Sequence, residues 1–123
     1  MEQKEGKTFD LEERTLAFAM AVRVFVKTLT RSVANVEDGK QVVRSSGSVG
    51  ANYIEANEAL SKKDFMMRIK IARKEAKESV YWLRLIEADA SLEVKRVTLE
   101  REAVELTKIL SSILLKSADR SLN

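Results

Sequence analysis

Five basic side chains recur on one side of the segment 62–90, and they are the residues of this chain best suited to binding an anion. They are Lys63, Lys70, Lys74, Lys77 and Arg84, with Tyr81 among them. At 100° per residue, these positions share the side of a helix that faces away from its apolar stripe. Cations spaced along a helix can neutralise the phosphates of a nucleic acid. A charge run is more often a solvated face, so the strip has two interpretations, a nucleic-acid-binding face or ordinary surface.

The distribution of charge favours this segment over the rest of the chain. The chain carries 22 Lys and Arg against 19 Asp and Glu, a net charge of +3, which is small for a nucleic-acid binder. Residues 61–90 alone hold eight basic and five acidic side chains. In an oligomer the strip would be repeated around the assembly, and the electrostatic fields of the repeated strips would add together. RNA or DNA is therefore one candidate partner, and a protein is the other.

The residue types that the chain lacks exclude most enzyme chemistry. Its 123 residues include no His, no Cys and no Pro. The chain therefore has no imidazole base, no Ser-His-Asp triad, no thiol nucleophile and no metal site with His or Cys ligands. Gly47 and Gly50 lie inside a helical segment and lack the strand and the Gly-Lys-Ser/Thr of a phosphate loop. We predict a non-enzymatic protein without catalytic residues, metal or cofactor.

Four segments have apolar residues at alternating spacings of four and three, which predicts four amphipathic helices. The expected ranges are about 10–33, 37–60, 62–90 and 95–118. Asp10 and Ser61 are placed to cap the first and third helices, because each can accept a hydrogen bond from the backbone N–H three residues on. Short connections make neighbouring helices antiparallel. The sequence predicts an all-α, up-down-up-down antiparallel four-helix bundle that forms a single domain over residues 1–123.

A second stripe of mostly small or polar residues runs along the segment 37–60, beside the apolar one. It consists of Gln41, Ser45, Ser48, Asn52, Glu55 and Ala59. Gly47 and Gly50 lie in the same region, and each costs about 1 kcal/mol relative to Ala inside a helix. Close approach by a neighbouring helix, in the same chain or in another subunit, would offset that cost. The alternative is a polar pocket lined by Asn52, Glu55 and the serines.

The segment 62–90 is apolar over more than one face, which predicts burial on two sides. Met67, Ile71 and Trp82 lie well away from its core stripe. In a chain of this size a second buried side indicates a subunit interface, because exposed apolar area is otherwise a liability. We therefore expect a homo-oligomer. Its candidate interface residues are Ser45, Ser48, Asn52, Glu55, Met67, Ile71 and Trp82.

No stretch of the sequence predicts targeting or membrane insertion. Residues 1–7 are polar with no apolar core behind them, unlike a signal peptide. The longest apolar stretches carry Arg or Lys at short intervals, so none is expected to span a membrane. A cytoplasmic location is the resulting expectation.

Three blocks of the sequence resemble a known family. The segment 41–56 reads QVVRSSGSVGANYIEA and is followed by Ala59, Ser61, Lys62, Lys63, Asp64 and Phe65. A second block contains KIARKEA at 70–76, Glu78 and YWLRLI at 81–86, and a third reads ELTKILSSI at 105–113. Over roughly residues 9–115 the chain resembles the bacterial four-helix bundle family that includes proteins encoded in the intervening sequences of 23S ribosomal RNA genes.

The resemblance implies a left-handed antiparallel bundle that assembles into a homopentameric ring. A distant relative is the accessory variability protein of diversity-generating retroelements, a basic pentameric barrel that binds nucleic acid and a reverse transcriptase. What the resemblance implies for this chain is therefore fold and assembly, with nucleic-acid binding as a lead. It supplies no catalytic residue.

Overall fold

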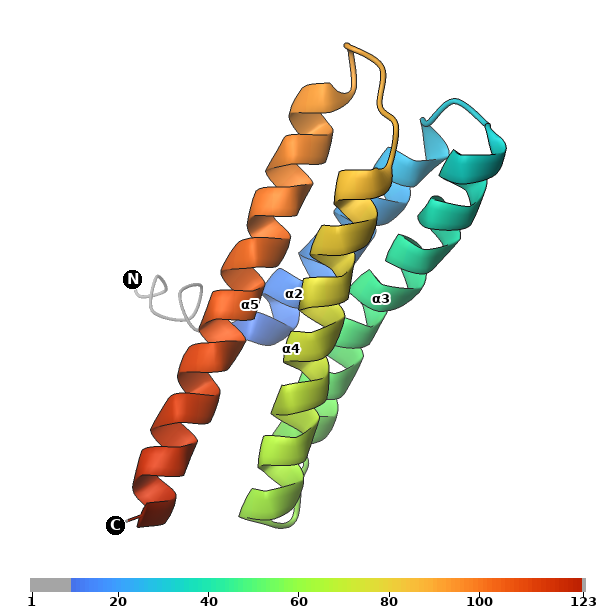
Figure 1. Cartoon of the computed structure of the whole chain (residues 1–123). Helices are drawn as coiled ribbons and strands as arrows, with labels where there is room; N and C mark the ends of the chain where they lie inside the picture. Colours follow the sequence, from blue (N-terminus) through green and yellow to red (C-terminus); the bar gives the residue numbers. More distant parts are fainter. Residues whose placement is uncertain (1–9, 123) are drawn as a thin grey trace, which may run out of the picture.

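The computed structural model describes residues 10–122, with side chains as far as Ala118. Over that range the chain forms four α-helices and no strand: α2 (Leu11–Lys27), α3 (Val33–Asn57), α4 (Lys62–Leu85) and α5 (Glu93–Leu122). Successive helices run in opposite directions and lie side by side (Figure 1). The predicted all-α architecture of four helices is confirmed. The prediction made for residues 1–7 lies outside the described residues.

Each helix packs mainly against two neighbours, so α2 and α4 occupy diagonal corners of the bundle. α3 contacts α2 and α4, whereas α5 contacts α4 and, more loosely, α2. A two-bond ion pair joins α2 to α5, with Arg14 Nε 2.7 Å from Glu102 Oε2 and Arg14 Nη2 2.9 Å from Glu102 Oε1. This hydrogen bonding raises the pKa of the Arg14 guanidinium. The largest fully buried side chains between the helices include Val22, Phe25, Val42, Val49, Ile69, Leu83, Leu106 and Leu110.

Two of the helices begin at the caps that the sequence indicates. Asp10 Oδ1 accepts a hydrogen bond from the backbone N–H of Glu13 at 3.1 Å. Ser61 Oγ accepts one from the backbone N–H of Asp64 at 3.0 Å. Each bond satisfies a donor that the first turn of a helix leaves without a partner. Both cap predictions are confirmed.

The first connection begins earlier than predicted. α2 ends at Lys27 rather than near residue 33, and its C-cap is Thr28, whose backbone N–H donates to the carbonyl oxygen of Phe25 at 3.0 Å. α3 begins at Val33 rather than near residue 37, because Ser32 is its N-cap. Ser32 Oγ accepts from the backbone N–H three residues on, at 3.0 Å. The polar stretch that interrupts the apolar periodicity therefore contains both a connection and a helix start.

The remaining helix ends also differ from the prediction. α3 ends at Asn57 rather than near residue 60, and α4 ends at Leu85 rather than near residue 90. Ile86 leaves α4 with an extended backbone (ψ 135°), and the residue after it is hydrogen-bonded to α3. α5 spans Glu93–Leu122 rather than 95–118, since a backbone bond to the carbonyl oxygen of residue 92 already closes its first turn.

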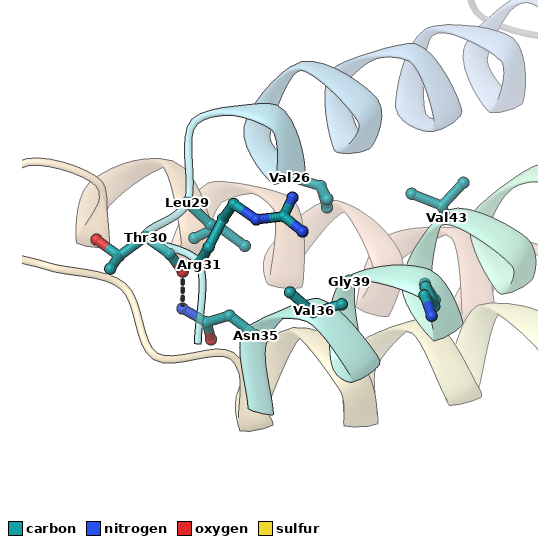
Figure 2. Close-up of a pocket in the computed structure, with 9 residues that line it drawn as sticks. Val26, Leu29, Thr30, Arg31, Asn35, Val36, Gly39 and Val43 are labelled. Atoms are coloured by element: carbon teal, nitrogen blue, oxygen red, sulfur yellow. Dashed lines mark hydrogen bonds between the residues drawn. The ribbon is translucent and has the colours of Figure 1, made fainter. Parts of the chain in front are cut away.

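A buried asparagine joins two connections at one end of the bundle. Asn35 Nδ2 donates to the carbonyl oxygen of Thr30 at 3.0 Å (Figure 2) and to that of Glu87 at 2.9 Å. Asn35 Oδ1 accepts from the backbone N–H of Glu87 at 3.0 Å. A single amide therefore satisfies backbone groups of both the α2–α3 and the α4–α5 connection, which fixes where α4 ends relative to α3.

Small residues of α3 allow its two neighbours to approach closely. A Cβ added at Gly50 would lie 2.7 Å from Thr15 Oγ1 and 3.1 Å from Thr15 Cβ, both on α2. Thr15 is buried and its hydroxyl donates to the carbonyl oxygen of Leu11 at 2.7 Å, so the contact is with a fixed side chain. On the side of α4, the hydroxyls of Ser45 and Ser79 lie 2.8 Å apart. The predicted close approach of a helix from the same chain is confirmed at Gly50.

The two glycines in the middle of α3 make a matched pair of substitutions. Gly50→Ala should lower the free energy of unfolding by up to about 2 kcal/mol, because overpacking costs about 1–3 kcal/mol and helix propensity returns about 1. Gly47→Ala should raise it by up to about 1 kcal/mol, because its new Cβ meets only the flexible end of Arg23 at 3.4 Å. Urea denaturation at one protein concentration measures both, and a stabilising Gly50→Ala would contradict the close contact.

Asn35 and Asn57 allow a second comparison within the same helix. Asn35→Ala leaves three backbone groups without partners and should lower the free energy of unfolding by about 1–3 kcal/mol. Asn57→Ala removes only an exposed bond to Glu12 (2.9 Å) and should change it by less than about 0.5 kcal/mol. Thermal or urea unfolding of the two variants tests the role of the buried amide. Equal effects of the two substitutions on the free energy of unfolding would refute that role.

Candidate functional site

The five predicted basic residues all lie exposed on the outer side of α4. Lys63, Lys70, Lys74 and Lys77 form no ion pair with any side chain that the structure describes. We call these four residues the lysine strip. Arg84 differs, because its Nε lies 3.7 Å from Glu100 Oε2 on α5.

Arg84 is at the edge of an ion-pair network that joins α4 to α5. Arg96 Nη1 lies 3.1 Å from Glu100 Oε1 and also donates to the carbonyl oxygen of Leu83 at 3.2 Å. Arg96 Nη2 lies 2.6 Å from Glu93 Oε2. The hydrogen bonding lowers the pKa of the Glu93 carboxyl and raises the pKa of Arg96. Arg84 therefore shares its carboxylate partner, whereas the lysine strip has no carboxylate partner among the described side chains.

Two of the acidic residues of α4 form ion pairs with α3. Arg44 of α3 places its Nη2 3.3 Å from Glu75 Oε1 and 3.1 Å from Glu78 Oε1. One guanidinium therefore offsets part of the charge of these two carboxylates at the contact between α3 and α4. Because the lysine strip outnumbers the one acid that lines the hollow beside it, Glu78, the outer side keeps a local positive charge that the total of +3 conceals.

A surface hollow of about 540 Å³ adjoins the lysine strip. It is lined by Lys70, Arg73, Lys74, Lys77, Glu78, Tyr81 and Trp82. Arg73 was not among the predicted basic residues. It lies three residues after Lys70 and four before Lys77, and this helical spacing was the signal in the sequence that could have identified it. The hollow therefore combines four cations with an aromatic wall.

Tyr81 and Trp82 form that aromatic wall. Their ring centroids are 5.0 Å apart with an interplanar angle of 74°, an edge-to-face pair. Tyr81 is 57% exposed, whereas Trp82 is half-buried and its Nε1 is buried without a hydrogen-bond partner among the described residues. Trp82 thus anchors the pair, and Tyr81 is the part open to solvent.

At least one of the predicted interface residues is not accessible to another copy of the chain. Ser45 is fully buried inside the protomer, where its hydroxyl is used by Ser79. Asn52 donates to the carbonyl oxygen of Ser48 at 2.9 Å and accepts from Arg68 of α4 at 3.2 Å, so it joins two helices of one chain. The other predicted residues vary in exposure: Glu55 is exposed, Met67 is 51% exposed, and Ile71 is half-buried.

An apolar surface that the sequence analysis did not single out lies on the outer side of α2. Leu16, Met20 and Val24 are 60%, 58% and 59% exposed. They recur every four residues, a second stripe opposite the core stripe, and this spacing was the signal available in the sequence. Across a hollow of about 350 Å³ between α2 and α3, Ile54 is 47% exposed and extends the same surface.

A further hollow of about 280 Å³ lies beside the Asn35 amide (Figure 2). Val26, Val36 and Val43 give it apolar walls, and Arg31 lies at its rim. In the part of the chain with described side chains, no group of three or more acidic residues could hold a metal ion. None of the helices within residues 10–122 has both the length and the apolar character to cross a membrane.

Comparisons with known proteins show which family the chain resembles. The family described as 23S rRNA-intervening sequence protein matches residues 7–112. A solved structure of a protein with unknown function, from the S23 ribosomal protein family of Bacteroides thetaiotaomicron, is 31% identical to the chain. That likeness covers 84% of this chain and 96% of the other, with a TM-score of 0.68. No curated protein sequence matches the chain.

Proposed function

The chain belongs to the 23S rRNA-intervening sequence protein family, and we propose that it is a non-enzymatic, homo-oligomeric accessory protein that binds RNA or DNA. The observation that carries this proposal is the lysine strip, because its four ammonium groups lack carboxylate partners in the described part of the chain. Glu75 and Glu78 of α4 share the guanidinium of Arg44, which reduces the negative charge that a polyanion meets beside the strip. Phosphates are the natural counterions for such a surface.

Self-association would strengthen nucleic-acid binding, because the positive charge of the lysine strip in a single copy is modest. The apolar surface of α2 supports it, since three large side chains in line are more than half exposed. The family resemblance implies a ring of five copies, and a ring would repeat the strip five times. Because repeated basic patches act together on a long polyanion, binding would gain from assembly without any new contact.

A charge-reversal experiment tests the nucleic-acid role. The wild-type protein should bind labelled RNA or DNA at 50 mM salt, and its affinity should fall steeply towards 200 mM. The triple variant K70E/K74E/K77E should lose binding at both salt concentrations. Changing the same lysines to Gln should reduce the slope of log K against log salt by about 2, since each phosphate contact on a single strand contributes about 0.7. Fluorescence anisotropy measures both quantities.

The control for that experiment reverses three lysines of α5. K95E/K108E/K116E changes the net charge by the same amount on exposed positions and should retain most of the binding. Equal losses in the two triple variants would assign binding to net charge rather than to α4. Absence of wild-type binding at 50 mM salt would overturn the proposal. Protein co-purification that survives nuclease and high salt would then favour a protein-interaction scaffold.

The proposed assembly gives a separate prediction. Light scattering should report a multiple of the 13.9 kDa chain, five copies in the implied ring. Met20→Glu should shift the protein towards single copies, because burying an unpaired carboxylate costs several kcal/mol, more than about a hundredfold in Kd. Met67→Glu, a similarly exposed methionine on α4, is the matched control. A wild-type mass of one chain would refute self-association, and dissociation by Met67→Glu alone would place the interface on α4.

A further inference from the structure

We propose that the α4 face recognises single-stranded rather than double-stranded nucleic acid, with one base stacked on Tyr81. This inference rests on the proposed nucleic-acid role and adds the class of substrate to it. Its starting point is that the hollow beside the lysine strip contains both partners that a single strand requires, cations for phosphates and an aromatic ring for a base.

The Tyr81 ring is held in place but left open. Its edge-to-face contact with Trp82, at a centroid distance of 5.0 Å, limits its rotation. In an edge-to-face pair one ring contacts the other with its rim, so at least one face of Tyr81 is uncovered by Trp82 whichever ring supplies the rim. With 57% of Tyr81 exposed, a planar base can reach that face from solvent.

Cations lie on the N-terminal side of this ring along the helix axis. Lys77 precedes Tyr81 by four residues and Lys74 precedes it by seven, which correspond to about 6 Å and about 10 Å at the α-helical rise. Arg73 lines the same hollow. The acid in the hollow, Glu78, lies 3.1 Å from Arg44, which it shares with Glu75, so its charge is offset in part. Phosphates on one side of a stacked base therefore meet ammonium groups rather than carboxylates.

A duplex cannot use this arrangement fully. Its bases are stacked on one another and paired, so an aromatic ring on the surface of a straight helix reaches only its backbone. The duplex would gain phosphate contacts from the lysine strip and nothing from Tyr81, whereas an unpaired base would add stacking. Stacking does not depend on base identity, so weak sequence preference is expected.

The experiment compares a fluorescent oligouridylate with an RNA duplex of the same length, at one low salt concentration. The wild-type protein should bind the single strand more tightly. Tyr81→Ala should weaken single-strand binding about 5- to 100-fold and leave duplex binding unchanged, whereas Tyr81→Phe should retain single-strand binding. Trp82 is the single tryptophan of the chain, so its emission should change on binding the unlabelled single strand and respond less in Tyr81→Ala. Circular dichroism confirms that each variant keeps its helices.

The outcomes separate this inference from the function on which it rests. The wild-type protein could bind single strand and duplex equally, with binding lost in K70E/K74E/K77E and kept in Tyr81→Ala. That result would overturn the stacking proposal and leave the nucleic-acid role in place. Loss of duplex and single-strand binding together in a folded Tyr81→Ala protein would also overturn it. Failure of the wild-type protein to bind either probe would overturn both.

Discussion

The close packing of α3 against two neighbours is the constraint on which the rest of the bundle depends. Gly50 leaves room for Thr15 of α2, and Ser45 meets Ser79 of α4 through a buried hydrogen bond. A larger side chain at either contact would push a helix outwards, since protein interiors leave few voids to absorb one. Because α3 sets the positions of both α2 and α4, it also determines which of their side chains face solvent.

The local features of this fold and the antiparallel order of its helices could be predicted from the sequence, whereas its specific long-range side-chain contacts could not. Periodicity and the caps at Asp10 and Ser61 depend on neighbouring residues, and the structure agrees with them. Asn35 acts through bonds to a residue 52 positions away, and no local pattern indicates such a partner. For this reason the helix ends that it controls were placed several residues too far along.

The same distinction explains what was found and what was missed in the candidate site. Helical geometry alone places the lysines of α4 on one side, but the capture of the acids by Arg44 requires α3 beside it. Small residues such as Ser45 indicate close packing without saying whether the partner helix belongs to the same chain. The outer stripe of α2 was visible in the spacing of Leu16, Met20 and Val24, but the core stripe alone already accounted for that helix.

The diagonal placement of α2 and α4 links the proposed assembly to the proposed binding face. α2 contacts α3 and α5 but packs across the core from α4, so the outer sides of α2 and α4 point in opposite directions. If the apolar side of α2 faced the centre of the assembly, the lysine strips would therefore face its outer wall. Adjacent strips on an outer wall can engage one continuous polyanion, which a narrow central channel would restrict. The apolar surface would then bring copies together, and the basic surface would bind a polyanion more tightly because several copies contact it at once.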